Sequence, residues 1–242
     1  MKEKIKSAIR RVLNFSNLDL TKNLKYDRLT TIIFKKVLSP DSNCIDVGCH
    51  KGEMLDLMLK YAPKGKHLGF EPIPSFFDKL EEKYRGVSKI YSCALSENTG
   101  ETTFQFVKNA PAYSGIKKRK YDVKNPEIEE INVKLEKLDN LIEDGFKVDL
   151  IKIDVEGAEL GVLKGAKETI KKNKPVIVFE FGKGASEFYG TKPEDIYSFL
   201  VGECGLRIFN LHDWIKGNKP LSLDDLSRTY HDSLEYYFIA AE

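Results

Sequence analysis

The sequence contains little cysteine, and its four cysteines, at positions 44, 49, 93 and 204, include no pair with the CxxC spacing. That absence argues against a zinc site or a redox motif and favours reduced thiols. No stretch approaches the roughly 18 consecutive apolar residues that a membrane span requires. The N-terminus is basic but lacks the continuous apolar core of a secretory signal. We therefore expect a cytoplasmic protein without a membrane span.

An excess of one charge is also missing, since 39 Lys and Arg are balanced by 37 Asp and Glu. Balanced charge gives no global reason to expect nucleic acid as a partner. One basic run, Lys117-Lys118-Arg119-Lys120, could bind phosphates, but three glutamates follow it between 127 and 130. We interpret this run as part of a solvated loop. The same loop, with Tyr113 and Tyr121, could instead close over an acceptor as a lid.

Residues 1–40 are predicted to form an N-terminal helical segment that packs on the main domain. Positions 1–15 have the pattern of a basic amphipathic helix, for which weak contact with an anionic membrane surface is the alternative. A second helix is expected at 27–38, ending before Pro40, because proline disfavours helical geometry in the preceding residue. Residues 41–242 would form a single domain.

From residue 44 onward, strand and helix signals alternate, which is typical of a parallel sheet with helices on both faces. Strands are expected at 44–47, 67–70, 90–95, 148–155 and 175–181, with helices at 53–61, 76–84 and 160–170. Residues 103–107 and 131–135 alternate apolar with polar and predict an inserted antiparallel extension with a long loop, near 100–136. Residues 206–211 and 236–240 resemble an antiparallel pair at the sheet edge, with no clear helix between them.

Two motifs predict a nucleotide-like ligand at the first two strands. The segment from Cys44 to Gly52 is a strand followed by a glycine turn, which lets a ligand approach backbone amides. A dinucleotide fingerprint would need a glycine where His50 stands, so the G-x-x-x-G spacing disfavours a nicotinamide cofactor. Glu71, before Pro72 at the end of the second strand, could accept hydrogen bonds from two ribose hydroxyls.

Three carboxylates, Asp154, Glu156 and Glu180, follow two further strands and would meet at the same rim of the sheet. They could stabilise a cationic ligand, orient an acceptor hydroxyl or take its proton. Alternatively, Asp154 caps the following helix while Glu156 and Glu159 favour its dipole. The three could also hold a divalent metal, which is possible but not predicted. A histidine base at His50, His212 or His231 is a weaker alternative.

The stretch from 43 to 181 resembles the FkbM family of S-adenosylmethionine-dependent methyltransferases. The resemblance rests on Ile45-Asp46-Val47-Gly48, Phe70-Glu71-Pro72, Ala94-Leu95-Ser96, Leu138-Asp139 and most specifically the run from Ile151 to Glu159. The run Val162-Leu163-Lys164-Gly165-Ala166, followed by Pro175 and Glu180, continues it. The sequence departs from the family pattern at Cys49-His50-Lys51, where small residues or asparagine are frequent.

This resemblance implies a class I, Rossmann-like α/β fold whose seven-stranded sheet has an antiparallel last strand. It implies S-adenosylmethionine as cofactor, with contacts at Asp46, Gly48 and Glu71 and the adenine near Cys93-Ala94-Leu95. We add His50, Gly52, Pro72 and Asp154 to the expected cofactor contacts, and Asp154, Glu156 and Glu180 as catalytic candidates. The implied reaction is O-methylation of a hydroxyl on a sugar, a glycolipid or another small-molecule natural product. A nicotinamide-dependent oxidoreductase and a non-catalytic nucleotide-binding protein remain the alternatives, and the oligomeric state is not predicted.

Overall fold

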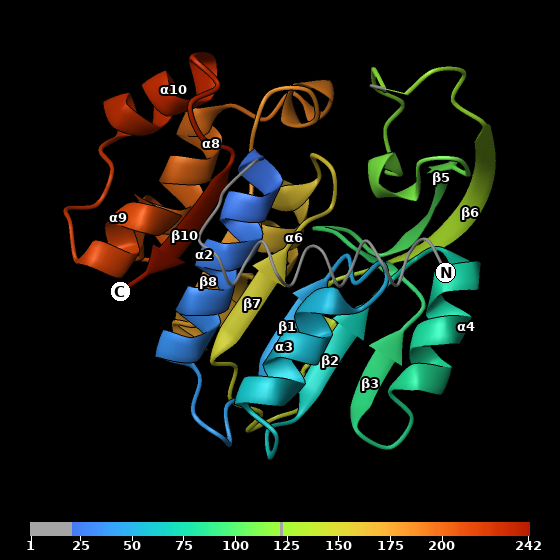
Figure 1. Ribbon diagram of the computed structural model, residues 1–242, viewed down its shortest axis with the longest axis horizontal. Helices are drawn as coiled ribbons and strands as arrows, with labels where there is room; N and C mark the ends of the chain where they lie inside the picture. The colour runs from blue at the N-terminus through green and yellow to red at the C-terminus, as the bar shows by residue number, and fades with distance from the viewer. Residues whose placement is uncertain (1–20, 122) are drawn as a thin grey trace.

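A seven-stranded sheet forms the centre of the protein in the computed structural model, which describes residues 21–121 and 123–242. The strand order is β3-β2-β1-β7-β8-β10-β9 (Figure 1). Strands β3, β2, β1, β7 and β8 pair in parallel, whereas β10 runs antiparallel to both β8 and β9. The predicted α/β fold with an antiparallel last strand is confirmed. The strands are β1 (Cys44–Val47), β2 (His67–Phe70), β3 (Ser88–Tyr91), β7 (Leu150–Ile153), β8 (Val176–Glu180), β9 (Arg207–Asn210) and β10 (Tyr237–Ala241).

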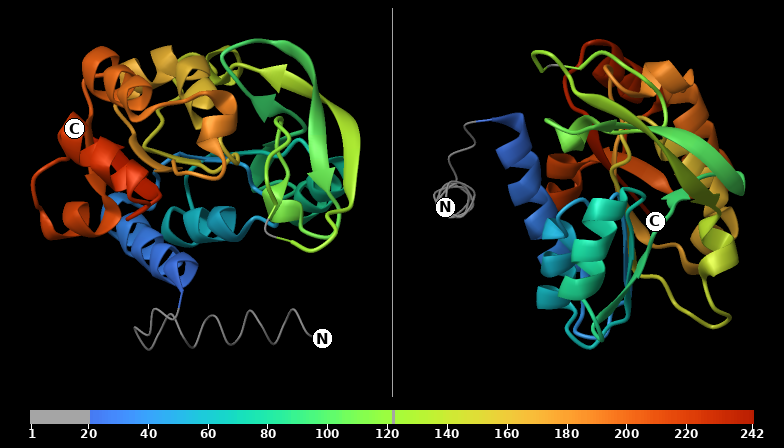
Figure 2. Two further views of the ribbon diagram at one scale, coloured as in Figure 1. Left: turned by 90° about the horizontal axis from the view of Figure 1, so that it is seen from above. Right: turned by 90° about the vertical axis from the view of Figure 1, so that its right-hand side faces the viewer.

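Helices cover both faces of this sheet, as the right-hand view of Figure 2 shows. One face is covered by α2 (Lys22–Val37), α3 (Glu53–Tyr61), α4 (Pro74–Lys83) and α9 (Leu211–Lys216). The other face is covered by α5 (Leu138–Leu141), α6 (Glu159–Gly165), α7 (Lys167–Asn173), α8 (Pro193–Tyr197), the π-helical turn η3 (Ser198–Glu203) and α10 (Leu223–His231). None of the helices within residues 21–121 and 123–242 is long and apolar enough to cross a membrane.

Each face of the sheet has its own hydrophobic core, because successive side chains along the buried strands point to opposite faces. In β7, Ile151 and Ile153 pack under α6 on one face of the sheet. Leu150 lies on the other face and packs against α2 and α3. Central strands of parallel sheets are apolar on both faces because helices cover both. Lys152 therefore stands out, since it is 5% exposed in the middle of such a strand.

Helix α2 packs into the core that also contains α3, α4 and α9. It begins at Lys22, five residues before the predicted start, and the hydroxyl of its Thr21 cap accepts a hydrogen bond from the Leu24 amide. Its side chains Leu29, Ile33 and Phe34 are at most 3% exposed. The helix predicted at 1–15 lies outside the described residues, and the division of the chain at residue 40 stays a prediction.

A small three-stranded sheet extends from the main one (Figure 1). Strands β5 (Gly100–Val107) and β6 (Ile128–Glu136) pair antiparallel as predicted, and β4 (Ala94–Leu95) adds to β6 in parallel. A single strand at 90–95 was therefore a wrong prediction. The chain bends at Ser92-Cys93, leaves the main sheet after β3 and enters the small one. We call β5, β6 and the residues between them the extension.

Two helix predictions also need correction. The helix expected at 160–170 is two helices, α6 and α7, that meet at Ala166. Gly165 packs so closely there that a Cβ would lie 2.0 Å from the Ser96 carbonyl oxygen. The expectation of no helix between 211 and 236 was wrong, because α9 and α10 occupy that segment. A reciprocal pair of hydrogen bonds between Ser222 and Asp225 starts α10, a capping box that can be found in the sequence.

Candidate active site

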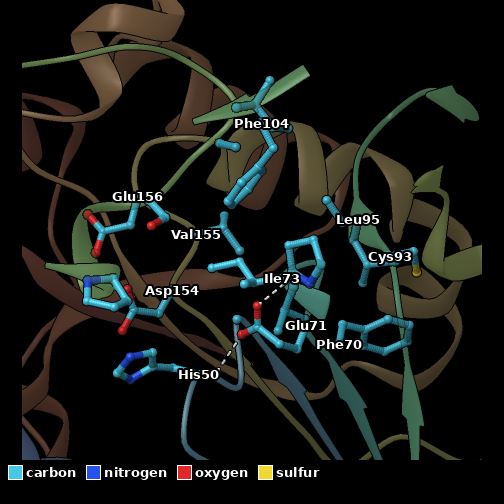
Figure 3. Close-up of a pocket in the computed structure, with 18 of the residues that line it drawn as sticks. His50, Phe70, Glu71, Ile73, Cys93, Leu95, Phe104, Asp154, Val155 and Glu156 are labelled. Carbon is cyan, nitrogen blue, oxygen red and sulfur yellow. Dashed lines mark hydrogen bonds between the residues drawn. The ribbon is translucent and has the colours of Figure 1, made fainter. Parts of the chain in front are cut away.

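A pocket lies beyond the carboxyl ends of β1, β2 and β7, and residues of the extension form part of its lining (Figure 3). Ligands of open α/β sheets bind at this edge, because the loops that follow parallel strands gather there. We call it the Glu71 pocket, after the carboxylate near its centre in Figure 3. Its lining includes Gly48, His50, Glu71, Pro72, Ile73, Cys93, Ala94, Leu95, Phe104, Ser114, Asp154 and Glu156.

Backbone hydrogen bonds fix the start of the loop after β1. The amides of Gly48 and Cys49 both donate to the Phe70 carbonyl, at 3.0 and 3.1 Å. Gly48 has φ +83°, and a Cβ there would lie 2.0 Å from the carbonyl oxygen of Asp154. Only glycine lets the loop pass this close to the end of β7.

Replacement of Gly48 by alanine should therefore destabilise the fold. Both the positive φ and the collision with backbone oppose a side chain, and together they should lower the free energy of unfolding by roughly 2–4 kcal/mol. Gly86→Ala is the matched control, because Gly86 has φ +78° with open space around it. Denaturant unfolding of both variants checks this. Equal losses would show that the close approach to Asp154 contributes nothing.

Glu71 links this loop to the segment that follows β2. Its Oε2 accepts a hydrogen bond from the His50 amide at 2.8 Å, and its Oε1 accepts one from the Ile73 amide at 2.9 Å (Figure 3). Burial raises the pKa of Glu71 to about 7, although the two amides oppose the shift. Each oxygen has a second lone pair, so the carboxylate can accept two more hydrogen bonds from a ligand in the pocket.

The Glu71 pocket is apolar at one end and charged at the other. Cys93 and Leu95 lie to the right of Glu71 in Figure 3, Asp154 and Glu156 lie to its left, and Phe104 lies above it. A flat apolar group would fit the first end and a cationic or hydroxyl group the second. This polarity is typical of small-molecule sites, where apolar walls surround a few placed polar groups.

The charged end is organised around Asp154, which follows β7 directly. Its Oδ2 accepts hydrogen bonds from the Lys152 ammonium at 2.9 Å and from the Tyr237 hydroxyl at 2.6 Å. Burial alone would raise the pKa of Asp154, but Lys152 and hydrogen bonds from Glu180 and Tyr237 hold it below its ordinary value. Burial and the Asp154 charge raise the pKa of Glu180 well above its usual range. These opposite shifts of the two pKa values favour an ionised Asp154 and a protonated Glu180.

Glu156 makes an ion pair with Arg119 of the extension. Glu156 has φ +58°, a strained region for a residue with a side chain, and such strain concentrates at functional sites. Burial and the neighbouring Asp154 raise its pKa to about 8 despite Arg119. The solvated-loop interpretation was wrong for Arg119, whose side chain is only 7% exposed, although Lys117, Lys118 and Lys120 are exposed.

A second pocket adjoins the first, and the two share Gly48, His50, Ala112, Asp154 and Glu156. We call it the α2 pocket, because residues of α2 form one wall. Residues at the start of β10, in the loop after β1 and in the extension also line this pocket. The wall from α2 and β10 consists of Asn23, Tyr26, Asp27, Thr30, Tyr236 and Tyr237.

Most of the predicted site residues meet at these two pockets. Gly48, His50, Glu71, Pro72, Cys93, Ala94, Leu95, Asp154 and Glu156 line the Glu71 pocket, and Glu180 lines the α2 pocket. Asp46 and Gly52 line neither of them. The buried Asp46 lies opposite Lys152 in the register of β1 and β7, and Gly52 packs under Tyr84. His212 and His231 are not among the residues that line either pocket.

The capping alternative for Asp154 does not describe the helix start. Helix α6 begins at Glu159, and its N-cap residue is Ala158. The Glu159 carboxylate accepts hydrogen bonds from the amides of Val155 and Gly157, at 3.2 and 3.0 Å. Glu159 therefore closes the turn between β7 and α6, and Asp154 remains available to the pockets.

Three residues of the charged end were not predicted as site residues from the sequence: Lys152, Arg119 and Tyr237. Lys152 carried a signal, because a lysine inside an otherwise apolar central strand needs a buried partner. Arg119 and Tyr237 gave none, since they meet Glu156 and Asp154 only through the tertiary fold. Tyr237 opens an antiparallel strand, and its first residue therefore lies at the edge where the parallel strands end.

The metal hypothesis has partial geometric support. One oxygen from each of Asp154, Glu156 and Glu180 lies within 4.8 Å of the other two. Lys152 and Arg119 form ion pairs with two of these carboxylates, Asp154 and Glu156. A divalent metal at this cluster stays a hypothesis.

Known proteins resemble this chain in sequence and in fold. The Methyltransferase FkbM domain matches residues 46–208. Methyltransferase sdnD of Sordaria araneosa is 28% identical over 51% of this chain, and the match spans 60% of the length of sdnD. The 2-O-methyltransferase NoeI of Sinorhizobium fredii is 27% identical over 64% of this chain and 68% of NoeI.

Among solved structures, the methyltransferase FkbM from Methylobacillus flagellatus superposes with a TM-score of 0.53 and 16% identity. That superposition covers 84% of this chain and 44% of the other, and it supports the fold alone. The family match includes the loop after β1, Glu71 and the three carboxylates, and it excludes α2 and β10. The chain belongs to the FkbM methyltransferase domain family.

Proposed function

We propose that this protein is an S-adenosylmethionine-dependent O-methyltransferase. The acceptor would be a hydroxyl on a sugar, a glycan or glycolipid, or another small-molecule natural product. The observation that carries the proposal is the placement of Glu71 between an apolar end near Cys93 and a charged end at Asp154 and Glu156. NoeI, which is named a 2-O-methyltransferase, supports oxygen as the methyl acceptor.

The Glu71 pocket fits the cofactor by its chemistry. The buried carboxylate, already held by two backbone amides, has lone pairs left for two ribose hydroxyls. Cys93, Ala94 and Leu95 would contact the adenine ring, and Asp154 would lie toward the sulfonium end. When bound, the cofactor supplies an activated methyl group, and the protein supplies orientation and electrostatics.

The acceptor would bind in the α2 pocket. Its shared boundary with the Glu71 pocket includes Asp154 and Glu156, so an acceptor hydroxyl there would lie beside both carboxylates. The wall from α2 and β10 offers three phenols, an amide and a hydroxyl, groups that hydrogen-bond to a hydroxyl-rich ligand. Since this wall lies outside the family match, it would set acceptor choice.

Within this arrangement, Glu156 would accept the proton of the acceptor hydroxyl, and Asp154 would orient the hydroxyl. A proton acceptor works best when its pKa is near the working pH. The raised pKa of Glu156, about 8, meets that condition, whereas the lowered pKa of Asp154 makes it a weak base. Glu180, whose raised pKa favours its protonated form, would support Asp154 through a hydrogen bond.

The test is methyl transfer itself. The purified protein is incubated with methyl-labelled S-adenosylmethionine and a panel of glycosides, glycolipid headgroups and hydroxylated macrocycles, and each product is analysed for a new ether-linked methyl group. We expect label on an oxygen of at least one class. Transfer only to nitrogen or carbon would contradict the O-methyltransferase proposal. Reduced nicotinamide binding in place of S-adenosylmethionine would favour the oxidoreductase alternative.

A further inference from the structure

Tyr237 is a phenol that reaches the carboxylate cluster from outside the family match. It pairs with Glu180 in the antiparallel register of β8 and β10, and it lines the α2 pocket. Its hydroxyl donates to Asp154 Oδ2 at 2.6 Å. Burial, followed by the charges of Asp154 and Glu180, raises the pKa of Tyr237 well above its ordinary value. The phenol therefore remains a hydrogen-bond donor throughout the neutral range.

Two donors thus converge on a single oxygen of Asp154. The Lys152 ammonium, from β7 itself, binds Oδ2 at 2.9 Å, and the Tyr237 hydroxyl binds the same atom from β10. A carboxylate held at one oxygen from two directions has little freedom to rotate. The Asp154 carboxylate also has Glu180 as a hydrogen-bond partner, and Asp154 lines both pockets at their shared boundary.

We propose that Tyr237 is a positioning residue that holds the Asp154 carboxylate so that its negative charge favours a sulfonium over a neutral thioether in the Glu71 pocket. This inference rests on the proposed cofactor, because it assigns the charged end of that pocket to the sulfur. The physical reason is electrostatic, since S-adenosylmethionine carries a positive charge on sulfur and S-adenosylhomocysteine does not. An oriented carboxylate near that sulfur stabilises bound S-adenosylmethionine but not bound S-adenosylhomocysteine. The weaker binding of the demethylated product helps it to leave.

The quantity that tests the proposal is the ratio of the two dissociation constants, S-adenosylhomocysteine over S-adenosylmethionine, measured by calorimetry on the full chain. Loss of a packing contact should weaken both ligands by the same factor, whereas misplacement of the Asp154 charge weakens the sulfonium alone. We expect Tyr237→Phe to lower this ratio by about tenfold, the equivalent of one hydrogen bond to a charged group.

Tyr236→Phe is the matched control, because the neighbouring phenol lines the same pocket but donates to Asn23 and not to Asp154. It should leave the ratio unchanged. Lys152 is a poorer choice for substitution, since its removal would leave the buried Asp46 and Asp154 without their cation.

A double-mutant cycle with Asp154→Asn completes the test. In the Asp154→Asn background, the further change Tyr237→Phe should not alter the ratio, because the charge that Tyr237 orients is absent. The proposal is overturned if Tyr237→Phe weakens both ligands equally, or if its effect on the ratio persists without the Asp154 carboxylate. Failure of the wild-type protein to bind either compound would instead contradict the proposed function, so the two failures are distinguishable.

Discussion

Glu71→Gln should weaken the binding of S-adenosylmethionine by about 100-fold. Glutamine has a single acceptor oxygen, so its NH₂ group would face the amide of His50 or Ile73, which currently donates to a carboxylate oxygen. One buried amide would lose its partner, and one ribose hydroxyl would lose a charged acceptor. Titration calorimetry measures the effect, with Glu101→Gln as a control because Glu101 is exposed on β5.

The same carboxylate should make cofactor binding depend on pH. Only the ionised form of Glu71 can accept four hydrogen bonds, and burial raises its pKa to about 7. Affinity for S-adenosylmethionine should therefore rise as the pH increases through about 7, and this rise should be absent in Glu71→Gln. A pH dependence unchanged by Glu71→Gln would assign it to another group, such as His50.

In the cofactor-free protein, the Glu71 shift should appear as a dependence of stability on pH. The folded pKa of about 7 exceeds the ordinary 4.5, so the folded state binds the proton more tightly than the unfolded state. The contribution of Glu71 to the free energy of unfolding is fully present below about pH 4.5, and it is lost as the pH rises through about 7.

Glu156→Gln should lower turnover by about 10²–10⁴-fold, the usual contribution of a general base. Glutamine cannot take the acceptor proton, although its carbonyl can still accept a hydrogen bond from Arg119. Cofactor affinity should remain close to that of the wild-type protein, because Glu156 is assigned to the acceptor. The measurement is kcat with the acceptor found in the panel, together with cofactor binding by the same variant.

The pH profile of turnover gives a second readout for Glu156. Because burial and Asp154 raise its pKa to about 8, the wild-type kcat should increase as the pH rises through about 8. That increase should disappear in Glu156→Gln. Near-wild-type turnover of this variant would contradict the assignment of Glu156 as the base and move that role to Asp154 or His50.

The sequence was sufficient to predict the parts of the fold that depend on local pattern. Strands β1, β2, β7 and β8 and helix α3 follow from apolar runs and helical periodicity, and their bounds agree with the predictions to within two residues. Two of the wrong predictions fall where tertiary contacts override the local pattern, whereas α10 was missed although its Ser222–Asp225 capping box is a local signal. Close packing of Gly165 on Ser96 divides α6 from α7, and pairing with β6 draws Ala94 and Leu95 out of the main sheet.

The residues of the candidate site also divide into those that the local sequence pattern predicts and those that only the tertiary fold brings together. Residues that follow strand ends, such as Glu71 and Asp154, could be predicted because the topology of a parallel sheet brings those ends together. Arg119 could not, because it reaches Glu156 from a loop of the extension 37 residues away in sequence. Tyr237 lies 83 residues from Asp154, and only the antiparallel insertion of β10 beside β8 joins them.

The central claim is that the Glu71 pocket holds the methyl-donor cofactor, and calorimetric titration of the wild-type protein with S-adenosylmethionine and S-adenosylhomocysteine tests it most directly. We expect saturable one-to-one binding of both compounds, with S-adenosylmethionine preferred and affinity strongly reduced in Glu71→Gln. Absence of binding by either compound, or binding that Glu71→Gln leaves unchanged, would contradict the assignment of this pocket.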